Sequence, residues 1–208
     1  MACVKRGTDM VSISTNEVFD GRRTDGAGYT ETDPTAPINP YGVSKLQGER
    51  LAAAAFAASE SAAKLWIVRT AWLFGPPGND FPNKVLAAAD RLERGVALPV
   101  VADETGSPTF TVELAAALIG LISTAPEGTY HLAAAGPATR FDVAQQVVGR
   151  CRPGVSLRGI GSDDFQRASE PPRWSVLDSS RAAGLGIRLR PWAEGLTAYL
   201  QEVCTPRI

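Results

Sequence analysis

The sequence of 208 residues is poor in cysteine and histidine, with three and one respectively. Cys3, Cys151 and Cys204 lie far apart and form no C-x-x-C pair, so the sequence predicts neither a disulfide framework nor a zinc site. We expect buried or incidental thiols in a reducing cytoplasm. The single histidine, His131, lies in the apolar stretch TYHLAA, and we interpret it as a packed strand residue rather than a ligand.

An excess of charge of one sign is also missing. The formal net charge is -1, with 44% hydrophobic and 21% charged residues, and lysine and arginine form no cluster. These features exclude a general electrostatic attraction to nucleic acid or membranes. The N-terminal MACVKRGTDM has no apolar signal core, and no apolar run reaches the length of a membrane span. The sequence therefore predicts a cytoplasmic protein whose partners are small molecules or other proteins.

Acidic side chains are not grouped as metal ligands. Glu31 and Asp33 form a pair in a loop that contains no histidine or further carboxylate, so we expect no metal site. Asp103 and Glu104 are neighbours in another loop, and we interpret both as solvated charges.

Strands and helices are predicted to alternate along most of the chain. From apolar periodicity and turn residues, we expect strands at 10–15, 65–74, 97–101, 129–134 and 155–160, and helices at 40–61, 81–94, 112–123, 141–150 and from Trp192. Such alternation is typical of an open α/β sheet that binds ligands at the carboxyl ends of its strands. The irregular pattern after Cys151 indicates a small lobe that supplies loops to a cleft.

One strand end and one helix start carry side chains that suit proton transfer. Asn39 and Pro40 favour a helix start, which puts Tyr41 and Lys45 one turn apart on one face, and Thr15 ends the first strand. If they converge, the lysine cation and the positive helix end favour the phenolate, and Tyr41 can exchange a proton with a carbonyl oxygen held by Thr15. A ketone polarised in this way accepts hydride from a nicotinamide. The alternative is simple surface packing.

Five segments resemble, in chain order, the dTDP-4-dehydrorhamnose reductases of the extended short-chain dehydrogenase/reductase family. They are ISTNEVFDG (13–21), YTETDPTAPINPYGVSKLQGE (29–49), VRTAWLFG (68–75), VVADETGSPT (100–109) and PPRWSVLDSSRAAGLGI (171–187). The resemblance implies an oxidoreductase of dTDP-rhamnose biosynthesis that transfers hydride from NADPH or NADH to C4 of a nucleotide-linked 4-keto-6-deoxysugar. A homodimer is a possible assembly.

The resemblance assigns roles by position. Tyr41 becomes the proton donor, Lys45 holds the nicotinamide ribose, and Thr15 binds the substrate oxygen. The cofactor-binding residues are Ser14, Tyr41, Lys45 and Arg69, and the substrate-binding residues are Asn16, Val18, Phe19, Trp72, Gly106, Ser107, Pro108, Thr109 and Arg173. Trp72 is expected beside the sugar ring and Arg173 beside the phosphates, with core packing and a surface salt bridge as the respective alternatives.

The fold that the resemblance implies is α/β. It is a partial NAD(P)-binding Rossmann-like parallel sheet with helices on both faces, plus a small C-terminal substrate-binding lobe. Residues 1–102 would be the C-terminal part of the cofactor domain. Residues 103–208 would be mainly the substrate-binding lobe, with 125–150 returning to the sheet.

Two features depart from the family pattern. Asn16 and Glu17 stand where the family usually has an aspartate and often an aromatic residue, so turnover could be slower. No glycine-rich turn follows a first strand, since GIGSDD (159–164) and GLGIRL (184–189) lack a third glycine and lie near the wrong end. We therefore expect the later part of a reductase, with an exposed apolar sheet edge and weak binding of NADPH.

Two other functions stay open at this stage. One is a non-catalytic regulatory or binding subunit of the same fold, like the beta subunit of methionine adenosyltransferase, and the absent glycine-rich loop favours it. The other is a nucleotide-sugar epimerase or dehydratase, which the reductase-like GSPT and PPRWSVLD segments disfavour.

Overall fold

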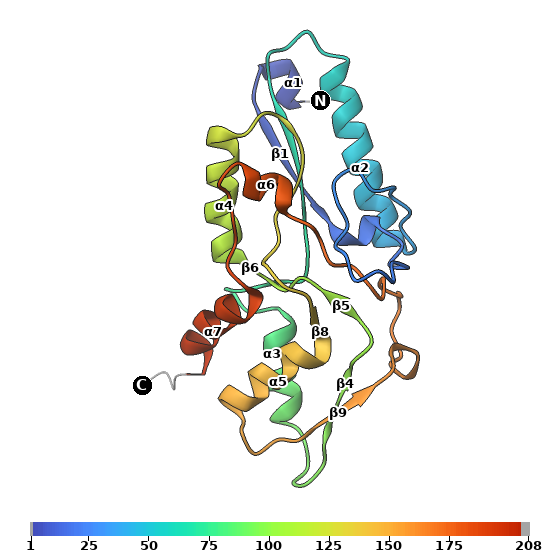
Figure 1. Cartoon of the computed structure of the whole chain (residues 1–208), viewed down its shortest axis with the longest axis vertical. Helices are drawn as coiled ribbons and strands as arrows, with labels where there is room; N and C mark the ends of the chain where they lie inside the picture. Colours follow the sequence, from blue (N-terminus) through green and yellow to red (C-terminus); the bar gives the residue numbers. More distant parts are fainter. Residues whose placement is uncertain (1, 205–208) are drawn as a thin grey trace.

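The structure, a computed structural model, describes residues 2–204, so the outermost residues of both predicted domains lie outside the described part. A three-stranded sheet occupies the half of the elongated molecule that holds the N-terminus (Figure 1). Its order is β1-β2-β7, formed by Met10–Thr15, Leu65–Thr70 and Gly128–His131, and both pairings are parallel. Since parallel strands end at one edge, side chains that follow these strands gather there.

Helices cover both faces of this sheet. Figure 1 shows α2 (Pro40–Ala57) on one side of the strands and α4 (Thr111–Thr124) on the other. α2 packs on β1 and β2, and the short α6 (Ser180–Gly184) packs on β7. The apolar layer under α4 contains Trp66, Val68, Leu114, Leu121, Tyr130 and Leu132, all buried. The predicted partial parallel sheet with helices on both faces is therefore confirmed.

A second group of elements forms the other half of the molecule. It consists of α3 (Phe81–Ala89), β4 (Leu98–Val101), α5 (Arg140–Cys151), β9 (Leu157–Ile160) and α7 (Trp192–Val203). β4 and β9 pair in parallel, and the helices pack around a core of Phe74, Val85, Leu98, Phe110, Val143, Val147, Leu196 and Leu200. Residues before and after position 102 of the sequence both contribute to this core. β7, which belongs to the predicted segment 125–150, lies in the three-stranded sheet. The domain boundary at residue 102 stays a prediction.

Short elements complete the described chain. They are α1 (Ala2–Arg6), η1 (Asn16–Val18), β3 (Leu73–Phe74), β5 (Thr105–Gly106), β6 (Thr109–Phe110), β8 (Ala138–Thr139) and η2 (Ser162–Asp164). β3 pairs with β6 and β5 with β8, so both pairs join distant segments of the chain.

The predicted strand at 65–74 is wrong in one respect, because it is broken after Thr70. Trp72 has a left-handed backbone, with φ of 45°, and the chain then continues as β3 outside the main sheet. A positive φ is unusual for a residue with a bulky side chain. Two predicted helices are also shorter than expected, since they end at Ala57 and Ala89 rather than near residues 61 and 94.

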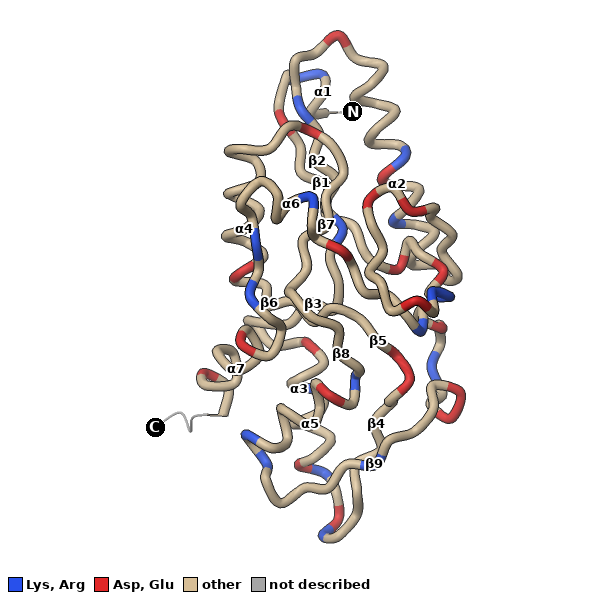
Figure 2. The backbone as a smooth tube through the Cα atoms, in the orientation of Figure 1, with Lys and Arg blue, Asp and Glu red and all other residues tan. Residues whose placement is uncertain are grey.

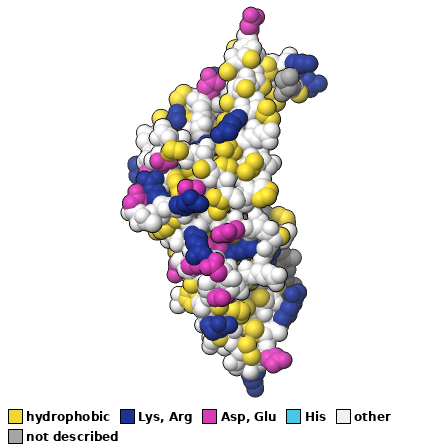
Figure 3. Space-filling view, turned by 90° about the vertical axis from the view of Figure 1, so that its right-hand side faces the viewer, with side chains coloured by type: hydrophobic (Ala, Val, Ile, Leu, Met, Phe, Trp, Pro, Cys, Tyr) yellow, Lys and Arg dark blue, Asp and Glu magenta, His cyan; other side chains and the backbone are white. Residues whose placement is uncertain are grey.

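β1 lies at an edge of the sheet. Among the described residues it pairs only with β2, and Ile13 is 37% exposed. Val43 and Leu51 of α2 are also exposed. Figure 3 views the molecule from the α2 side and shows apolar side chains exposed over its upper half, with charges of both signs near the middle. The expected apolar edge is therefore present. No described helix has the length and apolar character needed to cross a membrane.

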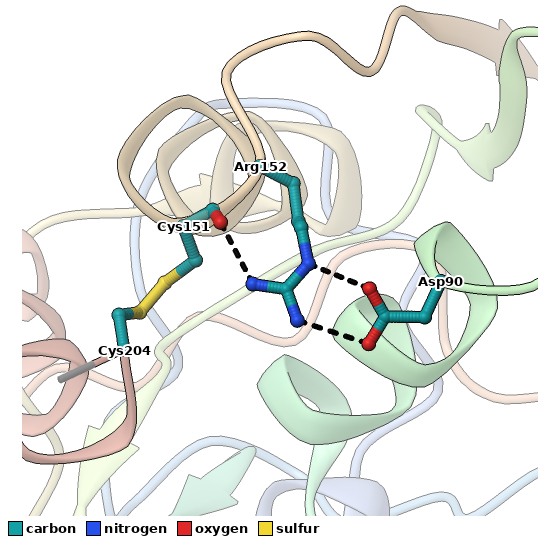
Figure 4. The surroundings of a disulfide bond; sticks show 4 residues. All are labelled: Asp90, Cys151, Arg152 and Cys204. Carbon is teal, nitrogen blue, oxygen red and sulfur yellow. Dashed lines mark hydrogen bonds and ion pairs between the residues drawn. A yellow bond between two sulfur atoms is a disulfide. The ribbon is translucent and has the colours of Figure 1, made fainter. Parts of the chain in front are cut away.

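A disulfide joins the ends of two helices in the second half. Cys151 ends α5 and Cys204 follows α7, with Cα atoms 5.4 Å apart, and Figure 4 shows the bond beside the ion pair of Arg152 with Asp90. The prediction of free thiols is thus wrong for these two cysteines, and Cys3 alone is free. The bond links residues 53 positions apart, and closing such a loop typically stabilises a fold by about 2–4 kcal/mol.

Candidate active site

Thr15 and Asn16 lie at the carboxyl end of β1 and are almost fully buried. The Thr15 hydroxyl accepts a hydrogen bond from the Glu17 N–H at 3.2 Å, which caps η1, and it lies 3.2 Å from the Asn16 Oδ1. Asn16 Nδ2 donates to the Ser175 carbonyl at 3.3 Å. Both side chains are therefore held in fixed positions where the strand ends.

The first turn of α2 packs directly on η1. Asn39 caps the helix by accepting from Gly42 N at 2.8 Å, and its Nδ2 donates to Glu17 Oε2 at 2.7 Å. A Cβ at position 42 would clash with the Glu17 carbonyl, so glycine permits this close approach. Tyr41 lies in the same turn and is 52% exposed, which leaves it open to a ligand.

Lys45 connects the next turn of α2 to the edge strand. Its Nζ donates to the Ile13 carbonyl at 2.6 Å, two residues before Thr15. The helix start that carries Tyr41 and Lys45 thus packs against the strand end that carries Thr15. The convergence of the three side chains and their catalytic roles stay predictions.

Ser14 and Arg69 point into the interface between the sheet and α2. Arg69 makes a bidentate ion pair with Glu49, with Nη2–Oε2 and Nε–Oε1 distances of 2.7 and 3.0 Å, and the Ser14 hydroxyl donates to Glu49. All three residues are buried, and Arg69 Nη1 has no partner in the described structure. Their visible function is to attach α2 to the sheet. Their contact with a cofactor stays a prediction.

His131 is a packed strand residue, as predicted. It lies beside Arg69 in the sheet and is fully buried, and its Nδ1 donates to the Tyr29 carbonyl at 2.9 Å. Burial, reinforced by the Arg69 cation, lowers the pKa of His131 to about 4. The ring is therefore neutral in the folded protein at neutral pH.

Stability should fall as the pH drops from 6.5 towards 4. In this window the unfolded chain protonates His131 and the folded chain does not, so the unfolded state binds more protons and folding weakens by up to about 3 kcal/mol. Urea unfolding at pH 7 and at acidic pH, on the wild type and on His131→Asn, measures this loss. The variant should lose less stability than the wild type. Equal losses would contradict the assignment.

Val18 and Phe19 lie in the core rather than at the surface. Both are fully buried, and the Phe19 ring stacks on Tyr29 with centroids 4.3 Å apart and lies against the Arg69 guanidinium at 5.3 Å. Their side chains form the core beneath the strand ends. Their predicted contact with substrate gains no support from this placement.

The GSPT loop, residues 106–109, is a buried junction. Thr109 Oγ1 accepts from the Ala134 N–H at 3.2 Å and donates to the Ser107 carbonyl at 2.9 Å, and Pro108 is buried too. Gly106 lies directly against the Trp72 indole, where a Cβ would clash with the ring. The loop therefore packs against one side of the Trp72 ring. Its contact with substrate stays a prediction.

Trp72 lines a cavity of about 600 Å³ between α3, β4 and the start of α5. The Arg140 guanidinium lies over its ring at 3.6 Å from the centroid. Glu104 lies behind Arg140, with an Nε–Oε2 distance of 3.9 Å, and also binds Arg167. The interpretation of Glu104 as a solvated charge is wrong, because only 2% of it is exposed. Arg140 and Arg167 were not recognised in the sequence, since no local pattern links them to Glu104.

Arg173 forms surface ion pairs. Its guanidinium contacts Asp103 at 3.1 Å and Asp163 at 2.7 Å, and 47% of the side chain is exposed. It lines a separate cavity of about 610 Å³ with Arg22 and Trp174. The alternative of a surface salt bridge is thus what the structure contains, and contact with phosphate stays a prediction.

The acidic pair in the other loop is engaged by protein groups. Asp33 binds Arg23 at 2.9 Å, and Glu31 accepts from the His131 N–H at 2.8 Å. No group of three or more metal-ligating side chains occurs within residues 2–204.

Comparison with known proteins identifies the family. Residues 1–205 match the family described as RmlD substrate binding domain. The chain belongs to this family. It is 40% identical over 202 residues to dTDP-4-dehydrorhamnose reductase of Mycolicibacterium smegmatis, covering 94% of this chain and 58% of that protein. It is 34% identical over 196 residues to the spore coat polysaccharide biosynthesis protein SpsK of Bacillus subtilis, covering 94% of this chain and 65% of that protein.

Solved structures of the same kind share the fold. The dTDP-4-dehydrorhamnose reductase of Bacillus anthracis in complex with NADP superposes with a TM-score of 0.84 at 33% identity, over 97% of this chain and 68% of that one. The Clostridium acetobutylicum dTDP-4-dehydrorhamnose reductase ortholog superposes with a TM-score of 0.86 at 30% identity, over 98% of this chain and 69% of that one. This RmlD-family chain thus has the Rossmann-like architecture of the reductases. It spans 58% and 65% of the length of the two curated relatives above.

Proposed function

We propose that this RmlD-family chain carries the substrate-binding and proton-transfer part of an NADPH-dependent reductase. Its substrate would be a dTDP-4-keto-6-deoxysugar in dTDP-rhamnose biosynthesis. The main support is that the start of α2, which carries Tyr41 and Lys45, packs on η1, which directly follows Thr15 at the end of β1. The relatives named dTDP-4-dehydrorhamnose reductase, and the NADP complex among them, support the substrate and the cofactor.

The chemistry follows from these side chains. Thr15, fixed by η1, would hold the C4 carbonyl oxygen, and the exposed Tyr41 hydroxyl would donate a proton to that oxygen. The hydride for C4 would come from bound NADPH. Lys45 lies at the open edge of β1 and fits the ribose of the nicotinamide, because its ammonium can exchange the Ile13 carbonyl for ribose hydroxyls.

Consumption of NADPH by the full-length gene product tests the proposal. We expect loss of NADPH absorbance only when the 4-keto nucleotide sugar is present, and a reduced sugar in equal amount. Absence of reduction by a folded full-length product would contradict the proposed function. The weak NADPH binding expected of the 208-residue polypeptide is a separate prediction, and a micromolar affinity would refute it.

A non-catalytic subunit is the second candidate, and the observation that favours it is the edge of β1, which pairs with no second strand within residues 2–204. An open edge strand can pair with another chain. Co-purification with a partner enzyme in equal amount, together with no turnover, would support this candidate. Location in the cytoplasm and a homodimer also remain predictions.

A further inference from the structure

Asn39, at the start of α2, binds two other segments of the chain. It is buried, with 3% of its surface exposed. Its Oδ1 accepts from Gly42 N at 2.8 Å, and its Nδ2 donates to Glu17 Oε2 at 2.7 Å and to the Glu170 carbonyl at 3.0 Å. One donor and two acceptors around the side chain fix the orientation of the amide. Asn39 thus joins the first turn of α2 to η1 and to the loop that follows η2.

Glu17 contacts the same helix start and also Thr15. Its N–H donates to the Thr15 hydroxyl at 3.2 Å, and its carboxylate accepts from Asn39. Its carbonyl lies so close to Gly42 that a Cβ there would be 2.1 Å away. Charged positions of both signs are mixed around the start of α2, its lower end in Figure 2, so this region is not an acidic patch. Glu17 therefore holds the Thr15 hydroxyl with one group and the first turn of α2 with two others.

The rest of α2 is attached to the sheet independently of Glu17. Glu49, further along the helix, makes the buried ion pair with β2 described above. Just before the helix, Ala36 N donates to the Val18 carbonyl at 2.9 Å. Loss of the Glu17 carboxylate should therefore leave the fold intact and loosen only the first turn, which contains Tyr41.

We infer that Glu17, acting through Asn39, is a positioning residue that fixes Tyr41 relative to Thr15. This inference rests on the proposed function, because the relative position of the two residues matters to turnover only if both act on one substrate. A misplacement of a reacting group by about 1 Å can lower a rate about 100-fold. The contact between Glu17 and Asn39 should therefore affect turnover more than substrate binding.

Steady-state kinetics on the full-length gene product test the inference. Glu17→Ala removes the acceptor and should lower kcat by about 10- to 100-fold with little change in KM, because the contact aligns reacting groups and does not bind substrate. Glu17→Gln should stay close to the wild type, since its amide oxygen can still accept from Asn39. Full turnover in Glu17→Ala would overturn the inference.

An exchange of donor and acceptor tests the contact itself. Asn39→Asp keeps a good helix cap but places a second carboxylate against that of Glu17, so kcat should fall as in Glu17→Ala. Addition of Glu17→Gln supplies an amide donor to the new carboxylate and should recover much of this loss. Turnover in the double variant that is equal to or lower than in Asn39→Asp would also overturn the inference. If Asn39→Asp does not fold, the comparison of Glu17→Ala with Glu17→Gln decides.

Gln146→Glu is the matched control for Asn39→Asp. Gln146 is partly buried, and its Nε2 donates to the Ala193 carbonyl and to Thr197 Oγ1, both at 2.9 Å. The variant makes the same change of an amide to a carboxylate, but between α5 and α7, so it should leave kcat unchanged. A loss of turnover equal to that of Asn39→Asp would show a general effect of the substitution and contradict the positioning role.

Hydrogen exchange separates this inference from the proposed function. The N–H groups of Gly42 and Val43 bond to Asn39, and they should exchange about tenfold faster in Glu17→Ala than in the wild type, because the first turn opens more readily. If the full-length product does not reduce the sugar but this exchange depends on Glu17, the proposed function is wrong and the positioning of the helix start stands. If reduction occurs and the exchange is unchanged in Glu17→Ala, the inference alone is overturned.

Discussion

Replacement of Tyr41 by phenylalanine should lower kcat for reduction of the 4-keto sugar by about 100- to 10,000-fold. The substitution removes only the hydroxyl, which is the expected proton donor, and keeps the ring on the exposed start of α2. Affinity for the nucleotide sugar should therefore change little. Steady-state kinetics and ligand binding on the full-length gene product measure both quantities.

Tyr130→Phe is the control for this substitution. The Tyr130 hydroxyl donates to the Pro126 carbonyl at 2.9 Å, and the ring is buried in the core under α4. Tyr130→Phe likewise removes only a phenolic hydroxyl, and it should leave kcat unchanged. Unaltered turnover in Tyr41→Phe would remove Tyr41 from the mechanism, and equal losses in both variants would point to a structural effect.

Replacement of Glu49 by glutamine should destabilise the fold by about 3–5 kcal/mol, because the Arg69 cation is left buried without its counter-ion. Arg69 Nη1 already lacks a hydrogen-bond partner among the described residues, so the guanidinium depends on Glu49 for its hydrogen bonds. The lost interaction is the one that attaches α2 to the sheet. Urea unfolding at neutral pH measures the free energy of unfolding.

Asp90→Asn provides a matched comparison at the surface. Asp90 and Arg152 also form a bidentate pair, with distances of 2.6 and 2.9 Å, but 50% and 39% of their side chains are exposed. An exposed pair of this kind contributes about 0–1 kcal/mol, so the variant should be nearly as stable as the wild type. Equal effects of the two substitutions would show that burial does not set the strength of the Glu49 pair.

Local patterns predicted the elements that form the sheet. MVSIST became β1, and the Asn39-Pro40 start of α2 is capped as expected. These features depend on neighbours in the sequence, through side-chain alternation and helix capping. The packing of the α2 start on the end of β1 is set by the tertiary fold, and the grouping of Tyr41, Lys45 and Thr15 around one substrate stays a prediction.

Features that depend on distant segments were not predicted. The LWIVRTAWLF run looked continuous, yet Trp72 breaks it because β3 pairs with β6, more than thirty residues later. The sequence analysis interpreted Glu104 as a solvated loop charge, yet its carboxylate forms an ion pair with Arg167. Cys151 and Cys204 meet because α5 and α7 pack together. None of these contacts leaves a periodic or spacing signal.

The predicted site residues also fall into two groups, those at a surface or cavity and those in the core. Asn16 follows β1 and Trp72 lies in a cavity wall, and their contact with substrate stays a prediction. Val18, Phe19, Ser14 and Arg69 lie in the motifs that resemble the reductases, but their side chains are buried in the core or in the α2 interface. Membership in a motif thus did not specify which side chains face the ligand.

The fate of hydrogen from labelled NADPH tests the central claim most directly. The full-length gene product is incubated with dTDP-4-keto-6-deoxysugar and NADPH that carries deuterium at C4 of the nicotinamide, and the product is analysed by mass spectrometry and NMR. We predict a 4-hydroxy sugar with deuterium bound to C4, formed by the wild type and almost absent with Tyr41→Phe. A sugar that is bound but returned without deuterium, or deuterium at another carbon, would contradict the account.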